Sequence, residues 1–139
     1  MSTKNVFAIA AHPDDIEFMM SGTMMLLGER GWQLHYMNVA TGSCGSDTED
    51  RDTIVAVRRR EGRRAAESIG AVYHESLTDD ITIFYERELL ARVASIVRDV
   101  APDIILTHYP FEYMEDHSNT CRLVVTAAFC RGMRNFPVA

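Results

Sequence analysis

One stretch near the amino terminus decides the fold, and its sequence is Ala11-His12-Pro13-Asp14-Asp15-Ile16-Glu17. The apolar segment before it, residues 5–10, is typical of a strand buried on both faces. Pro13 cannot continue a strand ladder but suits the first turn of a helix, where its missing N–H costs little. Asp14 and Asp15 then lie at the positive end of a helix dipole, which favours their ionised form. Because open α/β sheets bind ligands at the carboxyl ends of their strands, this stretch predicts a functional site.

Strand-like and helix-like segments alternate along the chain. We expect strands at residues 5–10, 34–40, 71–74 and 104–108, and helices at residues 15–29, 53–69, 86–100 and 118–131. Strands separated by helices predict βαβ units and a mainly parallel sheet. The expected fold is therefore α/β, a Rossmann-like arrangement of three layers. With no linker or repeat in the sequence, we expect one domain, residues 1–139. We also expect the methionines at positions 19, 20, 24 and 25 to fill the core.

Composition limits the classes of function. The chain has 139 residues, 47% of them hydrophobic, which is enough for one core. Its net charge of −6 argues against a general affinity for nucleic acid, because phosphate contacts need a surplus of Lys and Arg. No segment is long and apolar enough for a membrane span, and no signal peptide is recognisable. Cys44, Cys121 and Cys130 are odd in number and lack CxxC spacing, which favours a reducing compartment, so we expect a cytoplasmic protein.

The histidines divide into two groups. His12 and Asp15 are three residues apart across a strand-to-helix turn, so their side chains can converge on one metal ion. A third ligand should come from another loop on the same sheet edge, and His108 and His117 are the candidates. Three protein ligands leave one coordination position open, as catalytic sites require. The histidines at positions 35 and 74 lie within predicted strands, where we expect packing or surface roles.

At this point the chain resembles a known family. The segment 11–17 is similar to the AHPDD-x-E signature of PIG-L/LmbE-type zinc-dependent deacetylases, which remove N-acetyl groups mostly from N-acetylglucosamine-containing compounds. Three further segments fit family motifs: residues 39–42 fit its second strand and loop, residues 58–61 its R-x-x-E helix, and Asp116-His117 the end of its H-x-D-H motif. The resemblance implies a hydrolase acting on an N-acetylated sugar or glycoconjugate.

The resemblance also implies roles for individual residues. The metal ligands would be His12, Asp15 and His117. Zinc is the expected ion, and Fe(II), Co(II) and Mn(II) are chemically acceptable at the same ligands. Asp14 would be the general base that takes a proton from the attacking water, releasing acetate and a free amine. Arg58 would contact the substrate, and Glu17 would orient one of the ligands.

Two departures from the family pattern stand out. The first histidine of the H-x-D-H motif, which stabilises the oxyanion, falls on Met114, and a thioether cannot donate a hydrogen bond. Losing one oxyanion donor typically costs about 10²–10³ in rate. We expect His108 to substitute for it, with Asp116 orienting either His108 or His117. The second departure is length: family members are usually longer, so the resemblance implies that the family's C-terminal part is missing. An incomplete sheet exposes an edge strand and apolar helix faces, which predicts a homo-oligomer.

The same residues suggest three alternative functions. Met114 and the short chain favour a metal-binding α/β domain with weak or no catalysis, acting as a fragment or in assembly. Two histidines and one carboxylate also occur in non-haem Fe(II) oxygenases, but those usually have a β-sandwich and an H-x-D/E spacing. A nucleotide-binding domain is disfavoured, because His-Pro-Asp-Asp stands where a glycine-rich phosphate loop would be needed.

Overall fold

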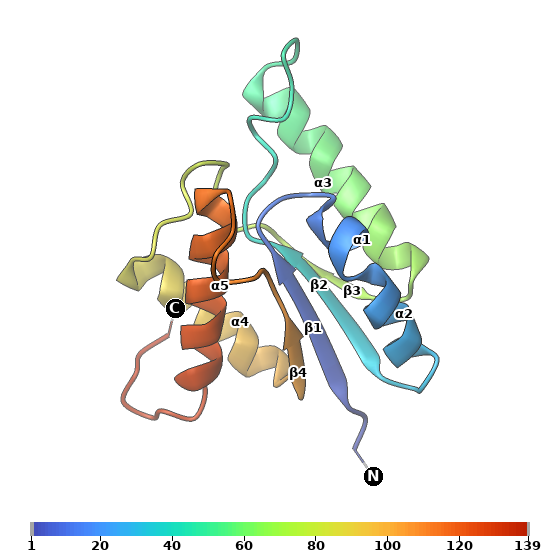
Figure 1. Cartoon of the computed structure of the whole chain (residues 1–139), viewed down its shortest axis with the longest axis vertical. Helices are drawn as coiled ribbons and strands as arrows, with labels where there is room; N and C mark the ends of the chain where they lie inside the picture. The colour runs from blue at the N-terminus through green and yellow to red at the C-terminus, as the bar shows by residue number, and fades with distance from the viewer. Residues whose placement is uncertain (1, 139) are drawn as a thin grey trace.

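The computed structural model describes residues 2–138 and has a four-stranded sheet between two layers of helices (Figure 1). The strands are β1 (Asn5–Ala10), β2 (Gln33–Asn38), β3 (Val72–His74) and β4 (Ile104–Leu106). The helices are α1 (Asp15–Met19), α2 (Ser21–Gly28), α3 (Arg51–Ser68), α4 (Arg87–Val100) and α5 (Glu115–Phe129). In the described part of the chain, no helix is long and apolar enough to cross a membrane.

The sheet is parallel throughout, with strand order β3-β2-β1-β4. β1 lies in the centre, with Ala10 opposite Asn38 of β2 and Ala8 opposite Leu106 of β4. The prediction of a Rossmann-like α/β fold is confirmed. The strand order switches at β1, because β2 and β3 follow on one side of it and β4 lies on the other, and in such sheets the crevice at the switch point holds the ligand.

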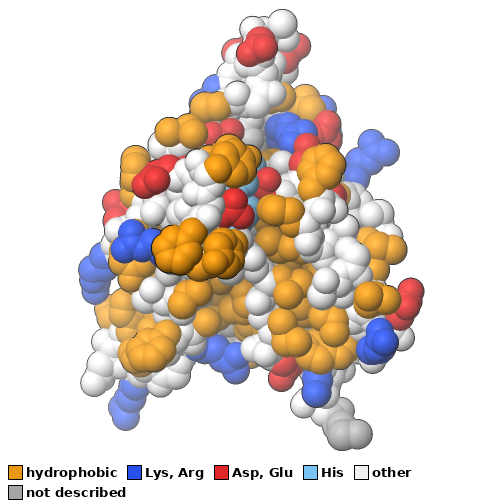
Figure 2. All heavy atoms as spheres, in the orientation of Figure 1, with side chains coloured by type: hydrophobic (Ala, Val, Ile, Leu, Met, Phe, Trp, Pro, Cys, Tyr) orange, Lys and Arg blue, Asp and Glu red, His pale blue; other side chains and the backbone are white. Residues whose placement is uncertain are grey.

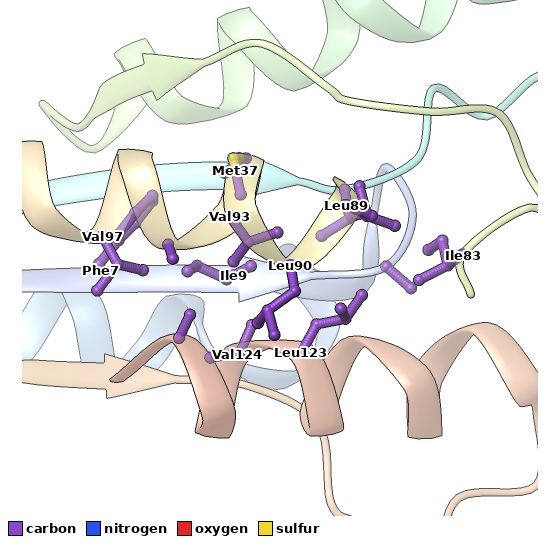
Figure 3. Close-up of a cluster of buried hydrophobic side chains, with 14 of the residues drawn as sticks. Phe7, Ile9, Met37, Ile83, Leu89, Leu90, Val93, Val97, Leu123 and Val124 are labelled. Carbon is purple, nitrogen blue, oxygen red and sulfur yellow. The ribbon is translucent and has the colours of Figure 1, made fainter. Parts of the chain in front are cut away.

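Alternate residues of β1 pack into two separate cores. Phe7 and Ile9 belong to the core beneath α4 and α5, which Figure 3 shows closed by Val93 and Leu123. Residues 6, 8 and 10 belong to the core beneath α1, α2 and α3. The period of two places successive side chains on opposite faces of the sheet. With both faces covered, β1 has no polar side chain except at its first residue, as a continuous apolar run predicts.

The predicted helix at residues 15–29 is wrong in detail, because the structure breaks it at Met20 into α1 and α2. The Ser21 hydroxyl donates to the Glu17 carbonyl, and a side chain inserted in this way into the backbone ladder is a known cause of kinks. The prediction that four methionines fill the core is correct for two of them. Met20 and Met24 are buried, whereas Met19 and Met25 are about half exposed.

The start of α5 also differs from the prediction, and this difference affects the site. α5 begins at Glu115, three residues before the predicted start at residue 118. Asp116 and His117 therefore lie in the first helical turn rather than in a loop, and both are buried. A carboxylate in the first turn interacts favourably with the helix dipole. The helix thus presents Asp116 and His117 from a rigid element at the carboxyl edge of the sheet.

Candidate metal centre and active site

The turn between β1 and α1 holds His12 and Asp15 in one place. The Asp15 carboxylate Oδ2 accepts from the backbone N–H of His12 at 2.8 Å, and the Asp15 N–H donates to the His12 carbonyl at 3.2 Å. Asp14 between them has φ of 84°, a left-handed conformation that aspartate tolerates better than most residues. The two side chains are thereby fixed by the backbone of their own turn.

Three potential metal ligands converge on one point. Ligand atoms of His12, Asp15 and His117 all lie within 4.8 Å of one another. The Asp15 Oδ2 atom is 3.5 Å from His12 Nδ1 and 3.2 Å from His117 Nε2. The two His117 ring nitrogens are buried and have no hydrogen-bond partner among residues 2–138. Buried polar atoms are normally satisfied, so this orphaned imidazole, next to a carboxylate and a second imidazole, fits a divalent cation.

Asp116 orients His12, which the sequence did not predict. Its Oδ2 atom accepts from His12 Nε2 at 2.7 Å and from the backbone N–H of Ile81 at 2.8 Å. The expected partners were His108 or His117. Because His12 donates through Nε2, the Nδ1 lone pair of the neutral ring is left facing the Asp15 carboxylate, 3.5 Å away. Carboxylate–histidine–metal arrangements of this kind fix both the tautomer and the orientation of the ring.

Glu112 is a site residue that sequence analysis missed. Its Oε2 atom lies 3.8 Å from His117 Nδ1, on the side of the ring opposite the Asp15 contact. Each of the two candidate histidine ligands therefore has a carboxylate near its second nitrogen. No motif marks Glu112, because it lies in the irregular loop between β4 and α5 and meets His117 only through the fold.

His108 is held inside the site by the backbone of β1. The N–H of Ala11 donates to His108 Nε2 at 2.9 Å, so in the neutral ring the proton is on Nδ1. Burial lowers the pKa of His108 to about 4, which keeps the ring neutral. The ring stacks on His117 with centroids 4.0 Å apart. His108, Glu112 and His117 also lie within metal-binding distance of one another, but this His108 tautomer has no lone pair left for a metal. The expected oxyanion role of His108 stays a prediction.

The carboxylates and His12 influence one another's ionisation. Burial opposes ionisation of Asp15, yet its hydrogen bonds with His12 hold the pKa of that carboxyl below its usual value. Burial likewise disfavours the charged form of His12, but the neighbouring carboxylates of Asp15 and Asp116 raise the pKa of His12 above its ordinary value. The site therefore concentrates negative charge around the imidazoles, as a cation requires.

Arg58 holds Asp14 in place from across the cavity. Its Nη2 atom donates to Asp14 Oδ2 at 2.7 Å and to the Pro13 carbonyl at 3.1 Å, while its Nη1 atom donates to Glu61 at 2.5 Å. Gly42 makes this possible: a Cβ atom there would lie 2.9 Å from Arg58 Cγ, and its φ of +83° disfavours other residues. The structure thus brings the predicted substrate-binding arginine to the predicted base.

Glu17 has a different partner from the one expected. The Tyr36 hydroxyl of β2 donates to Glu17 Oε1 at 2.5 Å, which ties α1 to the sheet beneath it. Burial raises the pKa of Glu17 despite this hydrogen bond. Its described hydrogen bonds do not reach a candidate metal ligand. The predicted role of Glu17, orienting a ligand, stays a prediction.

A cavity of about 440 Å³ opens beside these groups. It is lined by His12, Pro13, Asp14, Gly42, Cys44, Gly45, Arg58, Asp80, Ile81 and Met114. Figure 2 shows histidine and acidic atoms in a hollow between hydrophobic side chains. Met114, which the resemblance aligned with a catalytic histidine, is therefore at the site. Its thioether leaves this wall of the cavity without the hydrogen-bond donor that a histidine would supply.

Comparisons with known proteins place this site in a family. The diacetylchitobiose deacetylase of Thermococcus kodakarensis is 31% identical over 96% of this chain and 52% of its own length. The 4-oxalmesaconate hydratase of Pseudomonas putida is 26% identical over 82% of this chain and 47% of its own length. The solved structure of N,N′-diacetylchitobiose deacetylase from Pyrococcus horikoshii superposes with a TM-score of 0.89, at 27% identity, covering 97% of this chain and 53% of that chain.

The chain thus spans about half the length of these relatives. The family described as PIG-L, GlcNAc-PI de-N-acetylase, matches residues 7–128. This match runs from β1 to the end of α5 and includes every residue of the candidate site. Since it covers most of the sequence, the chain belongs to the PIG-L family.

Proposed function

We propose that the protein is a zinc-dependent hydrolase that removes an N-acetyl group from an N-acetylglucosamine-type sugar or sugar conjugate. The observation that carries this proposal is the convergence of His12, Asp15 and His117 at the carboxyl edge of the sheet, beside Asp14. The family described as a de-N-acetylase and the relative named as a diacetylchitobiose deacetylase support the reaction and its class of substrate.

The cation would be held by His12 through Nδ1, by His117 through Nε2 and by the Asp15 carboxylate. When bound, zinc supplies a Lewis acid that polarises an amide carbonyl and makes water more acidic. Asp116 keeps the His12 ring in the required tautomer, and Glu112 lies where it can do the same for His117. Of these three residues His12 lines the cavity, so a substrate bound there would lie next to the cation.

Asp14 is the proposed base. Its carboxylate lines the cavity and is about half exposed, so a water molecule can reach it from the substrate side. Arg58 binds one oxygen of this carboxylate and holds it at the cavity wall. Asp14 would take the proton from the attacking water and return it to the departing nitrogen, giving acetate and a free amine. Arg58 thereby contributes by fixing the base, in addition to any contact with substrate.

The experiment measures bound metal and released acetate on the same samples. Elemental mass spectrometry should find about one zinc per chain, and N,N′-diacetylchitobiose or N-acetylglucosamine should release acetate. Asp14→Asn should keep the zinc and lose about 10²–10⁴ in kcat, the usual contribution of a general base. Asp99→Asn, the same change on the exposed surface of α4, is the control and should behave as the wild type. Full activity of Asp14→Asn would refute the assignment of the base.

The alternative is a metal-binding domain with weak or no catalysis, and Met114 is the observation that favours it. Bound zinc without acetate release from any N-acetylated sugar would support this alternative. Met114→His separates the two cases, because a restored donor should raise a weak deacetylase activity by up to about 10²-fold and do nothing to an inert domain. Acetate release also separates deacetylation from water addition, the reaction for which the Pseudomonas relative is named.

A further inference from the structure

In the loop after β2, a carboxylate of the protein itself occupies a place where an anionic group of a substrate could otherwise bind. The backbone N–H groups of Gly42 and Cys44 both point to the Asp80 carboxylate, at 2.8 Å and 2.9 Å. The Ser43 hydroxyl completes the contact by accepting from the Asp80 N–H at 3.0 Å. Successive backbone N–H groups directed at one point form an anion-binding concavity. Here the protein's own carboxylate fills that concavity at the wall of the cavity.

The cavity has no free cation among its described lining residues. Arg58 is the lining residue with a positive charge, and its guanidinium is bound by Asp14, Glu61 and the Pro13 carbonyl. The next arginine along the same helix face toward the loop, Arg51, is paired with Asp79 and Asp52. Asp14 and Asp80 thus place two carboxylates on the cavity wall, and the Arg58 guanidinium is already paired with one of them.

From these contacts we infer that the site selects a substrate whose sugar is electrically neutral around the acetamido group. This inference rests on the proposed deacetylase function and narrows its substrate class. A carboxylate or phosphate on the sugar at this wall would lie beside Asp14 and Asp80, where the loop N–H groups and the Arg58 guanidinium are already engaged, and like charges at close range repel. Pro13, Ile81 and Met114 add apolar wall that suits the C–H faces of an uncharged sugar.

The first test compares two substrates that differ by one group, N-acetylglucosamine and N-acetylglucosamine 6-phosphate. With the zinc-loaded full chain at low ionic strength, kcat/KM for acetate release should be at least about tenfold lower for the phosphate. Added salt should narrow the difference by raising the value for the phosphate alone. If N-acetylglucosamine 6-phosphate is turned over as fast as the neutral sugar or faster, and added salt slows that turnover, the inference is overturned while the deacetylase proposal stays intact. No acetate from either sugar would overturn both.

The second test needs no catalysis. Inorganic phosphate is titrated into the isotopically labelled protein while the Gly42 and Cys44 amide resonances are followed by NMR. In the wild type these resonances should not shift at millimolar phosphate, because Asp80 occupies both N–H groups. In Asp80→Asn they should shift, and the kcat/KM ratio of phosphate to neutral sugar should rise by about tenfold. Asp99→Asn makes the same charge change away from the cavity and should alter neither readout. Phosphate binding to these amides in the wild type would overturn the inference.

Discussion

Two pairs of stacked histidines in this fold differ in their surroundings. His108 and His117 stack with centroids 4.0 Å apart at the carboxyl edge of the sheet, and His35 of β2 and His74 of β3 stack with centroids 5.2 Å apart. His35 Nδ1 and His74 Nε2 are 3.0 Å apart, so this pair satisfies itself with one hydrogen bond. Both of its rings also contact Phe7 in the core.

Neighbouring carboxylates distinguish the candidate site from the pair of His35 and His74. Burial lowers the pKa of His35 and lowers that of His74 to about 4, with no acidic neighbour opposing it. At the site, burial acts on His12 in the same direction, but two carboxylates overcome it and raise the pKa. We therefore expect an imidazole without acidic neighbours to pack in the core and an imidazole surrounded by carboxylates to bind the cation. The predictions below test this distinction.

The largest effect is expected from removing one histidine of each pair, because only one of the two variants should lose its zinc. His117→Ala should reduce bound zinc from about one per chain to nearly none, because two ligands remain. His74→Ala should keep the zinc, since His74 lies outside the ligand group. Elemental mass spectrometry after gel filtration measures both. Zinc lost from both variants would mean that the two pairs are not distinct, provided that circular dichroism shows both variants folded.

Replacing a carboxylate that lies next to a candidate histidine ligand should weaken zinc binding less than replacing the ligand itself. Asp116→Asn and Glu112→Gln should each weaken zinc affinity by about 10–100-fold, the usual effect of losing an orienting partner. Competition with a fluorescent chelator measures the dissociation constant without depending on activity. Glu115→Gln, next to Asp116 but exposed, is the matched control. An affinity unchanged in Asp116→Asn would show that the 2.7 Å contact with His12 does not orient the ligand.

Much of the fold was predictable because it depends on local patterns. The continuous apolar run of β1, the alternating segments and the helix-stopping residues each carry their own signal. The break at Met20 was missed because a serine hydroxyl that bends a helix has no effect on hydrophobic periodicity. The early start of α5 was missed because Glu115 and Asp116 resemble loop residues, although acidic residues also suit a first helical turn.

The site was predictable only where its residues are close together in the sequence. His12, Asp14 and Asp15 share one turn, so their spacing alone indicates a ligand group. Glu112 and Asp80 act through contacts that only the folded chain creates. Asp116 was identified correctly as a neighbour of the site, but its partner was not, because sequence distance does not indicate which imidazole it meets.

The pair of His35 and His74 predicts that the free energy of unfolding depends on pH. The folded pKa of His74, about 4, is below its ordinary value of 6.5, so the unfolded chain binds more protons in this range. Stability should therefore fall as the pH drops from 6.5 toward 4. Lowering the pH from 7 to 5 should reduce the free energy of unfolding by about 2 kcal/mol through His74. Urea unfolding of the metal-free protein at both pH values, compared with His74→Gln, isolates this contribution. Equal losses in the two proteins would contradict it.

The smallest effect is expected at the free edge of the sheet, which contains neither pair. Ile104 on the edge strand β4 is exposed, as are Val125 and Phe129 on α5. An unpaired edge beside apolar side chains favours self-association, so light scattering at micromolar concentration should give a mass above that of one chain. Val125→Lys should lower that mass. Zinc per chain should not change with dilution, because all three candidate ligands come from one chain. A monomer at every concentration would contradict the association, and zinc lost on dilution would mean that the ligand group is shared between chains.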